Sequence, residues 1–281
     1  MKFCKMCWYD IKNGCLKNFR LFLLPIVMEV VVLLLMAKRV GIYEQYDITA
    51  SKTLGDVLLY HFGGMGKYVL SADKAFEFPV IWMILFVLIL FVTLDYPVSN
   101  LQGFGSKVLV KGNSRIRWWL AKCVWNLICN VVYFGIIFLL IILFCSMKGI
   151  PFSLSVNSDL QTWLFELDAY TQLLPGVSMP IGELVQVFLV SVAICQLQMA
   201  LVLWLKPIYS FMVMCMFLLV SAYFQNDVLW GNYAMLLRHS WINEDGMDCR
   251  IGIPVTLTIT LITVCIGMIR FKGYNIMQEE N

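Results

Sequence analysis

The chain has 281 residues, of which 60% are hydrophobic and only 14% are charged, and its mean hydropathy is +0.79. An ordinary soluble domain carries about 25% charged residues, so the composition excludes one, and it also excludes a disordered chain. The 21 basic and 18 acidic residues leave a net charge of +3, which is too small to indicate a nucleic-acid partner. We therefore predict an all-α, polytopic membrane protein.

The segment before the first long apolar run, residues 1–20, predicts a helix lying in the cytoplasmic membrane interface. Its apolar residues recur near helical spacing, and its lysines lie elsewhere on the helix. A disordered basic tail is the alternative. No small-residue cleavage site follows the apolar run, so a cleavable signal is not expected.

Six apolar runs are close to the length that a helix needs to cross about 30 Å of hydrocarbon at about 1.5 Å per residue. Their continuous apolarity favours helices over barrel strands, in which lipid-facing and lumen-facing residues alternate. The third run is too long for one level helix, so part of it is expected to tilt or to extend into the interface. The predicted spans are residues 21–37, 78–94, 118–144, 184–205, 208–224 and 251–269.

Basic residues near the span ends predict the orientation, because Lys and Arg are retained on the cytoplasmic side. Most of them lie before the first span, between the second and third spans, in the short fourth connection and after the last span. Both termini are therefore predicted to be cytoplasmic, with residues 21–271 as one transmembrane domain and residues 272–281 as a tail. The predicted outer loops, which hold most of the acidic residues, are 38–77, 147–183 and 225–250.

Catalytic and metal-binding residues are scarce. The two histidines, His61 and His239, both lie in predicted outer loops and leave little material for acid–base chemistry. Most of the ten cysteines lie in spans or on the reducing side, so no disulfide framework is expected. Cys4 and Cys7 have CxxC spacing, but no second pair or nearby histidine completes a zinc site. The chain also lacks a phosphate-binding loop, and we predict no catalytic residue, metal or cofactor in it.

Polar residues inside the predicted spans are candidates for a transport pathway, because burying them in a membrane is costly. Glu29 lies in the middle of the first span. Asn126 and Asn130 lie one turn apart on one face of the third span, and Gln198 belongs to a similar polar stripe in the fourth. Hydrogen bonds between helices would explain the same residues without transport, and this alternative stays open.

The inner loop at residues 97–117 is basic and partly amphipathic. A short helix over about residues 100–110 would present Leu101 and Phe104 on one side, which could dock into a groove of a cytoplasmic partner. Ser114 is expected to cap the next helix. The basic charge alone would also suit a loop that only fixes the topology.

These residues together resemble the six-span permease subunits of type 2 ATP-binding-cassette (ABC) exporters, especially those of Firmicutes near peptide-antibiotic immunity and export systems. The resemblance covers nearly the whole chain, its patterns are of family level, and none of them identifies a substrate. The long first outer loop departs from the shortest exporters of this kind. The residues that carry the resemblance are the basic amphipathic N-terminal segment, Phe78-Pro79-Val80-Ile81-Trp82, the loop from Gly103 to Lys111, Ser114-Arg115, Trp118-Trp119, Lys122 and the Lys206-Pro207 turn.

The resemblance implies that the chain forms the translocation pathway in a bacterial cytoplasmic membrane, while a separate ATPase subunit binds ATP. A second permease, identical or related, would complete the pathway, and the cargo would be a peptide or a lipid-like amphipathic molecule. Glu29, Asn126, Asn130 and Gln198 would be candidates for substrate contact. The inner loop would act as the coupling helix, through Leu101, Gly103, Phe104, Gly105, Lys107, Lys111, Arg115 and Arg117.

Two functions from other classes remain. One is a membrane-embedded enzyme, for which Glu29 is the only strong acid–base candidate in the spans. The other is a membrane scaffold or sensor partner of a peptide-sensing system, which would not transport anything. A coupling loop that tolerates substitution would favour the second.

Overall fold

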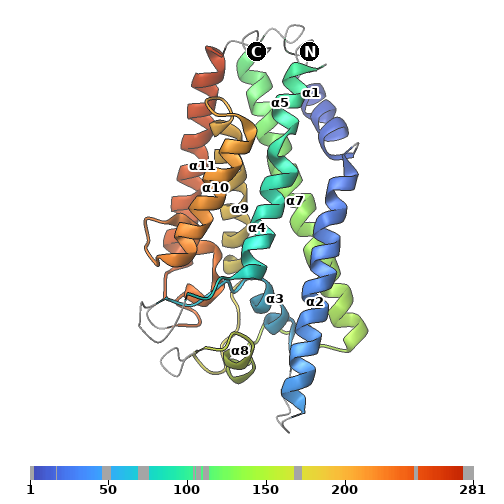
Figure 1. Cartoon of the computed structure of the whole chain (residues 1–281), viewed down its shortest axis with the longest axis vertical. Helices are drawn as coiled ribbons and strands as arrows, with labels where there is room; N and C mark the ends of the chain where they lie inside the picture. The colour runs from blue at the N-terminus through green and yellow to red at the C-terminus, as the bar shows by residue number, and fades with distance from the viewer. Residues whose placement is uncertain are drawn as a thin grey trace.

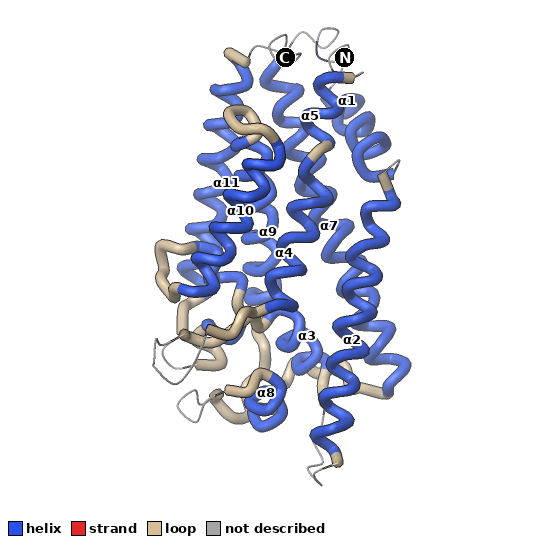
Figure 2. Tube along the Cα trace, in the orientation of Figure 1, coloured by secondary structure: helices blue, strands red, loops and turns tan. Residues whose placement is uncertain are grey.

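The protein is all-helical in a computed structural model that describes residues 3–16, 18–45, 52–68, 76–103, 105, 109, 114–167, 173–243 and 246–274. Helices account for 76% of the structure, and the described residues form no strand (Figure 2). The predicted all-α fold class is confirmed.

Five helical segments are long and apolar enough to cross a membrane, which makes the chain a membrane protein. Another apolar helix, α10 (Pro207–Tyr223), is shorter at 17 residues. The five segments contain α2 (Leu23–Glu44), α4 (Val80–Leu94), α7 (Arg115–Lys148), α9 (Ile181–Leu201) and α11 (Cys249–Lys272), and the segment that contains α4 continues to Leu101.

The long helices pack side by side in an elongated bundle (Figure 1). Two short helices, α1 (Phe3–Asp10) and α5 (Tyr96–Gln102), lie at one end of it, next to the beginning of α7 and the last turn of α11. We call this the terminus end. The opposite end, which carries α3 (Leu54–Phe62) and α8 (Ser158–Leu164), is called the far end.

The longest helix, α7, begins and ends at residues that suit helix termini. The Ser114 hydroxyl accepts a hydrogen bond from the Arg117 amide at 3.3 Å, so the expected N-cap is confirmed. Gly149 ends the helix with φ +66°, in the left-handed region that glycine adopts without strain. The 34 residues extend for about 51 Å at about 1.5 Å per residue, well beyond about 30 Å of hydrocarbon.

The N-terminal segment is helical, but it is not the single amphipathic helix predicted over residues 1–20. After α1, the chain widens into a π-helical turn (Ile11–Leu16) and then tightens into a 3-10 turn (Phe19–Phe22) that leads into α2. The buried residues also differ from the expected apolar face. Asp10 is buried, whereas Trp8 is 63% exposed.

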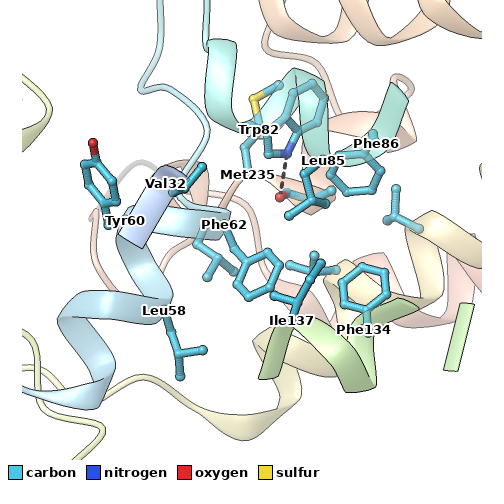
Figure 3. Packing of buried hydrophobic residues seen from close by; sticks show 14 of the residues in the cluster. Val32, Leu58, Tyr60, Phe62, Trp82, Leu85, Phe86, Phe134, Ile137 and Met235 are labelled. Atoms are coloured by element: carbon cyan, nitrogen blue, oxygen red, sulfur yellow. Dashed lines mark hydrogen bonds between the residues drawn. The ribbon is translucent and has the colours of Figure 1, made fainter. Parts of the chain in front are cut away.

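The predicted outer loops contain ordered structure at the far end. Helix α3 lies in the first of them, and all of its residues from Gly55 to Phe62 are buried. Figure 3 shows Phe62 next to Phe134 and Ile137 of α7, and the Phe62 and Phe134 rings stack with their centroids 6.0 Å apart. The third predicted loop folds into two 3-10 turns, η3 (Trp230–Ala234) and η4 (Leu236–Arg238). The Trp82 indole of α4 holds η3 by donating to the Ala234 carbonyl at 2.9 Å.

Two hydrophobic clusters stabilise the bundle. The larger one extends through the spans and α3. The smaller one lies at the terminus end and joins α1, the inner loop, α7, α9 and α11; we call it the terminus cluster. Its buried residues are Met6, Leu101, Leu109, Trp118, Trp119, Ala121, Met199, Ala200, Leu203 and Phe271.

Candidate coupling junction and buried polar groups

A buried lysine joins three helices at the terminus end. The Lys122 ammonium of α7 donates to Asp10 Oδ1 of α1 at 2.5 Å and to Asn100 Oδ1 of α5 at 2.7 Å. Lys122 is fully buried and Asp10 is 3% exposed. A buried ammonium is costly unless it is paired, so this contact fixes the position of both short helices on α7.

Aromatic rings enclose the same ammonium. It lies 4.5 Å from the centroid of the Tyr96 ring and 4.7 Å from that of the Trp118 ring. The Tyr96 hydroxyl donates to Asp10 Oδ1 at 3.0 Å, so this carboxylate oxygen accepts two hydrogen bonds. We call Asp10, Tyr96, Asn100, Trp118 and Lys122 the coupling junction.

Gly105 is confined by the coupling junction. A Cβ atom at this position would overlap both the backbone and the side-chain oxygen of Asn100. Since Asn100 accepts from the Lys122 ammonium, glycine at 105 leaves Asn100 free to reach it. Of the predicted coupling residues, Gly105 therefore has a role in packing.

The other predicted coupling residues differ in how far their side chains are exposed. Leu101 is only 5% exposed and packs within the terminus cluster, so it does not face a partner as expected. Arg115 donates to the carbonyl of Lys272, the last residue of α11, at 3.0 Å and to that of Tyr274, just after the helix, at 2.6 Å. Gly103 and Arg117 are exposed. Phe104, Lys107 and Lys111 lie outside the described residues.

The helix of the inner loop begins earlier than predicted. It was expected from about residue 100, but α5 begins at Tyr96, directly after α4. Pro97 occupies its first turn, where the missing N–H breaks no helical hydrogen bond.

Glu29, the first candidate for a pathway residue, faces a histidine that the sequence places in a loop. Glu29 of α2 and His61 of α3 are both fully buried, and Glu29 Oε1 lies 2.7 Å from His61 Nε2. His61 Nδ1 lies 2.9 Å from the Val57 carbonyl, which can only accept, so Nδ1 carries a proton. The Glu29–His61 contact therefore requires a second proton on either Oε1 or Nε2.

The other histidine is also paired with a buried glutamate. His239 Nδ1 contacts Glu183 Oε2 at the beginning of α9, and both residues are buried. Both histidines belong to segments predicted as outer loops, but their side chains are buried. Each one contacts a carboxylate inside the protein.

A second buried cation lies at the far end. The Arg238 guanidinium donates to the Ser221 and Ala222 carbonyls at 2.7 Å and 2.6 Å, to the Met65 and Gly66 carbonyls, and to the Asn232 side-chain oxygen. Within the described part of the chain, no carboxylate pairs with it. Burial lowers the pKa of Arg238 to about 10. Arg238 therefore binds α10 to the first outer loop through neutral oxygens.

The remaining pathway candidates make contacts between helices. Asn126 donates to Gln196 Oε1 of α9 at 3.1 Å, and Asn130 Oδ1 accepts from the Ser191 hydroxyl at 2.6 Å. Gln198 donates to the Leu90 carbonyl of α4 at 2.9 Å. These hydrogen bonds favour the interhelical alternative over substrate contact for all three candidates.

The cysteines are all free, although Cys15 and Cys129 lie close together with their sulfurs 3.1 Å apart. Among the residues that the structure describes, no group of three or more His, Cys, Asp or Glu side chains could hold a metal ion.

Comparison with known proteins gives one match. A family model described as a protein of unknown function (DUF2705) matches residues 49–277. The chain belongs to this family. No curated protein and no solved structure matches it. In this DUF2705 chain, the matched range includes Lys122, His61 and Arg238, whereas Asp10 and Glu29 precede it.

The sequence contains a weak signal for the coupling junction. Lys122 stands inside an apolar segment and follows Trp118 by one helical turn. That placement distinguishes Lys122 from the other basic residues between the second and third predicted spans, all of which were used to predict the orientation. Its partner Asp10 carries no comparable signal, because the two residues are 112 positions apart.

Proposed function

We propose that the chain is the membrane-spanning permease subunit of an ABC exporter in a bacterial cytoplasmic membrane. A separate ATPase subunit docks at the terminus end, and a second permease completes the pathway for a peptide or lipid-like amphipathic substrate. The observation that carries the proposal is the coupling junction. It attaches the short helix α5 to a transmembrane helix through a hydrogen bond from the buried Lys122 ammonium to Asn100, and the same ammonium forms an ion pair with Asp10 of α1.

The junction suits the transfer of motion from an ATPase to the spans. A short helix at the end of the bundle moves with a neighbouring span only if the contacts between them do not slip, and a buried charge is costly to separate from its partner. Lys122 provides such a contact for both α1 and α5, and Leu101 adds a buried apolar one. The exposed side of this assembly, which includes Gly103 and Arg117, is then the docking surface for the ATPase.

We also propose six spans, with α10 as the fifth and with both termini cytoplasmic. The residues just after α9, such as Leu203, belong to the terminus cluster, whereas Gly252 near the start of α11 lies against Tyr233 at the far end. The chain must therefore return between them, and α10 is the helix that connects the two ends. Its 17 residues extend for about 26 Å, a mismatch that local thinning of the bilayer accommodates at modest cost.

The first experiment is affinity purification of the tagged chain from its native membrane in mild detergent, followed by mass spectrometry. We expect a stoichiometric ATPase with nucleotide-binding motifs. If none is recovered under conditions that preserve a known ABC complex, the exporter proposal fails and the scaffold or sensor function takes its place.

A charge reversal locates the docking surface. Arg117→Glu changes an exposed residue at the terminus end, and Lys38→Glu is the matched control, exposed on α2 toward the far end. We expect Arg117→Glu to reduce recovery of the ATPase while the control retains it. Equal recovery with both variants would place the docking surface elsewhere.

The span count has its own test in the full-length chain. An epitope is inserted after Lys206 in one variant and after Asn226 in another, on either side of α10. The test uses cells from which any outer barrier to antibody has been removed. If the chain has six spans, antibody reaches the epitope after Asn226 in intact cells, whereas it reaches the epitope after Lys206 only after the membrane is permeabilised. Access to both from the same side would reduce the count to five.

A further inference from the structure

A cleft of about 470 Å³ opens between α2 and α7 at the far end. This volume is within the range of about 300–1,000 Å³ that is usual for small-molecule sites. Its apolar wall is formed by Met36 and Val40 of α2 and Phe144 of α7, all of them buried. The remaining lining residues are Ala37, Gly41, Glu44, Lys52, Lys148, Gly149, Ile150 and Pro151.

The cleft opens onto surface that faces lipid. On α2, one helical turn before Ala37, Leu34 is 62% exposed, and on α7, next to Lys148, Met147 is 78% exposed. These helices are long and apolar enough to cross a membrane, so the medium around such side chains is the bilayer. Met36 to Glu44 are the last residues of α2, and the wall that they form rises about 12 Å toward the far end.

Charge is concentrated at the interfacial mouth of the cleft. Lys52 is paired with Glu44 at 2.5 Å, which leaves this pair neutral. Lys148 at the end of α7 is exposed, and no acidic side chain in the described part of the chain pairs with it. The cleft therefore combines an apolar wall near lipid-facing surface with an exposed lysine at its mouth that no described carboxylate neutralises.

We propose that this cleft binds one phospholipid of the far-end leaflet, with an acyl chain against Met36, Val40 and Phe144 and its phosphate at Lys148. A phosphate accepts charge-assisted hydrogen bonds from an ammonium, and the acyl chain fills apolar space next to the bilayer. The inference requires only that the chain lies in a membrane. It stands or falls independently of the exporter function.

The test uses the full-length protein in liposomes that contain a phosphatidylglycerol with a photoactivatable group in its acyl chain. Mass spectrometry then maps the labelled residues. We expect labelling to concentrate on residues 36–41 and 144–151. Labelling spread evenly over all lipid-facing helices would overturn the proposal.

Two glycines supply a matched pair of variants. A Cβ atom at Gly41, which lines the cleft, or at Gly135, on the exposed surface of α7, would meet no described atom within 4 Å. Both leucine variants should therefore fold, which the elution profile of the purified protein checks. Gly41→Leu fills the cleft and should remove the concentrated labelling, whereas Gly135→Leu should retain it. Unchanged labelling in Gly41→Leu would contradict the site.

A headgroup comparison tests the phosphate contact. Lys148→Gln should reduce labelling by the phosphatidylglycerol probe about fivefold, as expected for one lysine near the membrane surface. The same variant should leave labelling by a diacylglycerol probe unchanged, because that lipid lacks a phosphate. Equal reductions with both probes would show that Lys148 does not bind the phosphate and would overturn that part of the assignment.

Discussion

Lys122 at the terminus end and Arg238 at the far end are both buried cations, but their partners differ in kind. Lys122 relies on one carboxylate, that of Asp10, together with one amide oxygen and two aromatic rings. Arg238 relies on five neutral oxygens and has no carboxylate partner among the described residues. An ammonium needs an opposite charge to enter the interior, whereas the planar guanidinium can distribute its charge over many carbonyls.

The difference has a mechanical meaning. In the coupling junction, one ammonium holds two short helices on α7, α1 through an ion pair and α5 through a hydrogen bond, so the loss of Lys122 removes both contacts. Arg238 is held by oxygens of three segments, namely the first outer loop, the end of α10 and η3. The far end is thus held by more separate contacts, and under the proposed function the terminus end is the part that couples to the ATPase.

The largest effect is expected at Lys122. Lys122→Met leaves the Asp10 carboxylate buried without its counter-ion, which should lower the free energy of unfolding by about 3–5 kcal/mol. Denaturant titration of the purified protein measures the change. Adding Asp10→Asn to Lys122→Met should recover part of the loss, because no buried charge then remains. A double variant as unstable as the single one would show that packing, rather than charge, dominates the junction.

Arg238→Lys tests the other half of the comparison. A lysine keeps the charge but has three donors in place of five, so at least two of the five oxygens lose their partner. Each buried unsatisfied acceptor costs at least about 1 kcal/mol, and we expect a loss of about 2–3 kcal/mol. Arg39→Lys is the control, because Arg39 is a partly exposed arginine with one hydrogen bond to the Leu164 carbonyl. Similar losses in both variants would contradict a special role for the guanidinium fork.

The sequence predicted the helical elements better than the partnerships between them. Apolar runs are local, so the long helices and the Ser114 cap of α7 could be located without tertiary information. Glu29 also stands out in the sequence, because a carboxylate inside an apolar run is visible there. Its partner His61 could not be recognised in the sequence, since α3 has only nine residues and is too short to be distinguished from a loop.

The coupling junction shows why the rest could not be predicted. Asp10 and Lys122 lie 112 positions apart, and each one alone is typical of a solvated charge near a membrane. Leu101 was expected to face a partner because it lies on the apolar face of the predicted helix. Helical spacing shows which residues share a face, but it does not show whether that face points to a partner or to the protein's own core. That direction is decided by Met6, Trp118 and Phe271, with which Leu101 packs in the terminus cluster.

At the far end, the pH dependence of stability should depend on Asp56, a fully buried carboxylate in the first turn of α3. Burial raises the pKa of Asp56, although hydrogen bonds from Gln161, Asn157 and Thr53 oppose the change. The folded state then binds this proton more tightly than the unfolded state, so the associated stability is present at acid pH and declines as the pH rises through the raised pKa. The decline is at most about 1.4 kcal/mol per pH unit.

Asp56→Asn should remove this decline, because an amide does not titrate. Unfolding measured from about pH 4 upward compares it with Asp159→Asn, which changes an exposed aspartate in nearby α8. The control should retain the wild-type slope. An identical slope in all three proteins would show that Asp56 ionises normally in the fold.

The smallest effect concerns a hydrogen bond between α7 and α9, from Ser191 to Asn130 Oδ1 at 2.6 Å. A double-mutant cycle with Asn130→Ala and Ser191→Ala should give a coupling of about 0.6 kcal/mol and at most about 1.7 kcal/mol, the range found for hydrogen bonds between membrane helices. The same variants test whether Asn130 contacts the substrate. If Asn130 only joins two helices, Asn130→Ala and Ser191→Ala should lower export by similar amounts, because both remove the same hydrogen bond. If export falls sharply in Asn130→Ala but not in Ser191→Ala while both remain folded, Asn130 contacts the substrate, and the polar stripe of α7 lines the pathway after all.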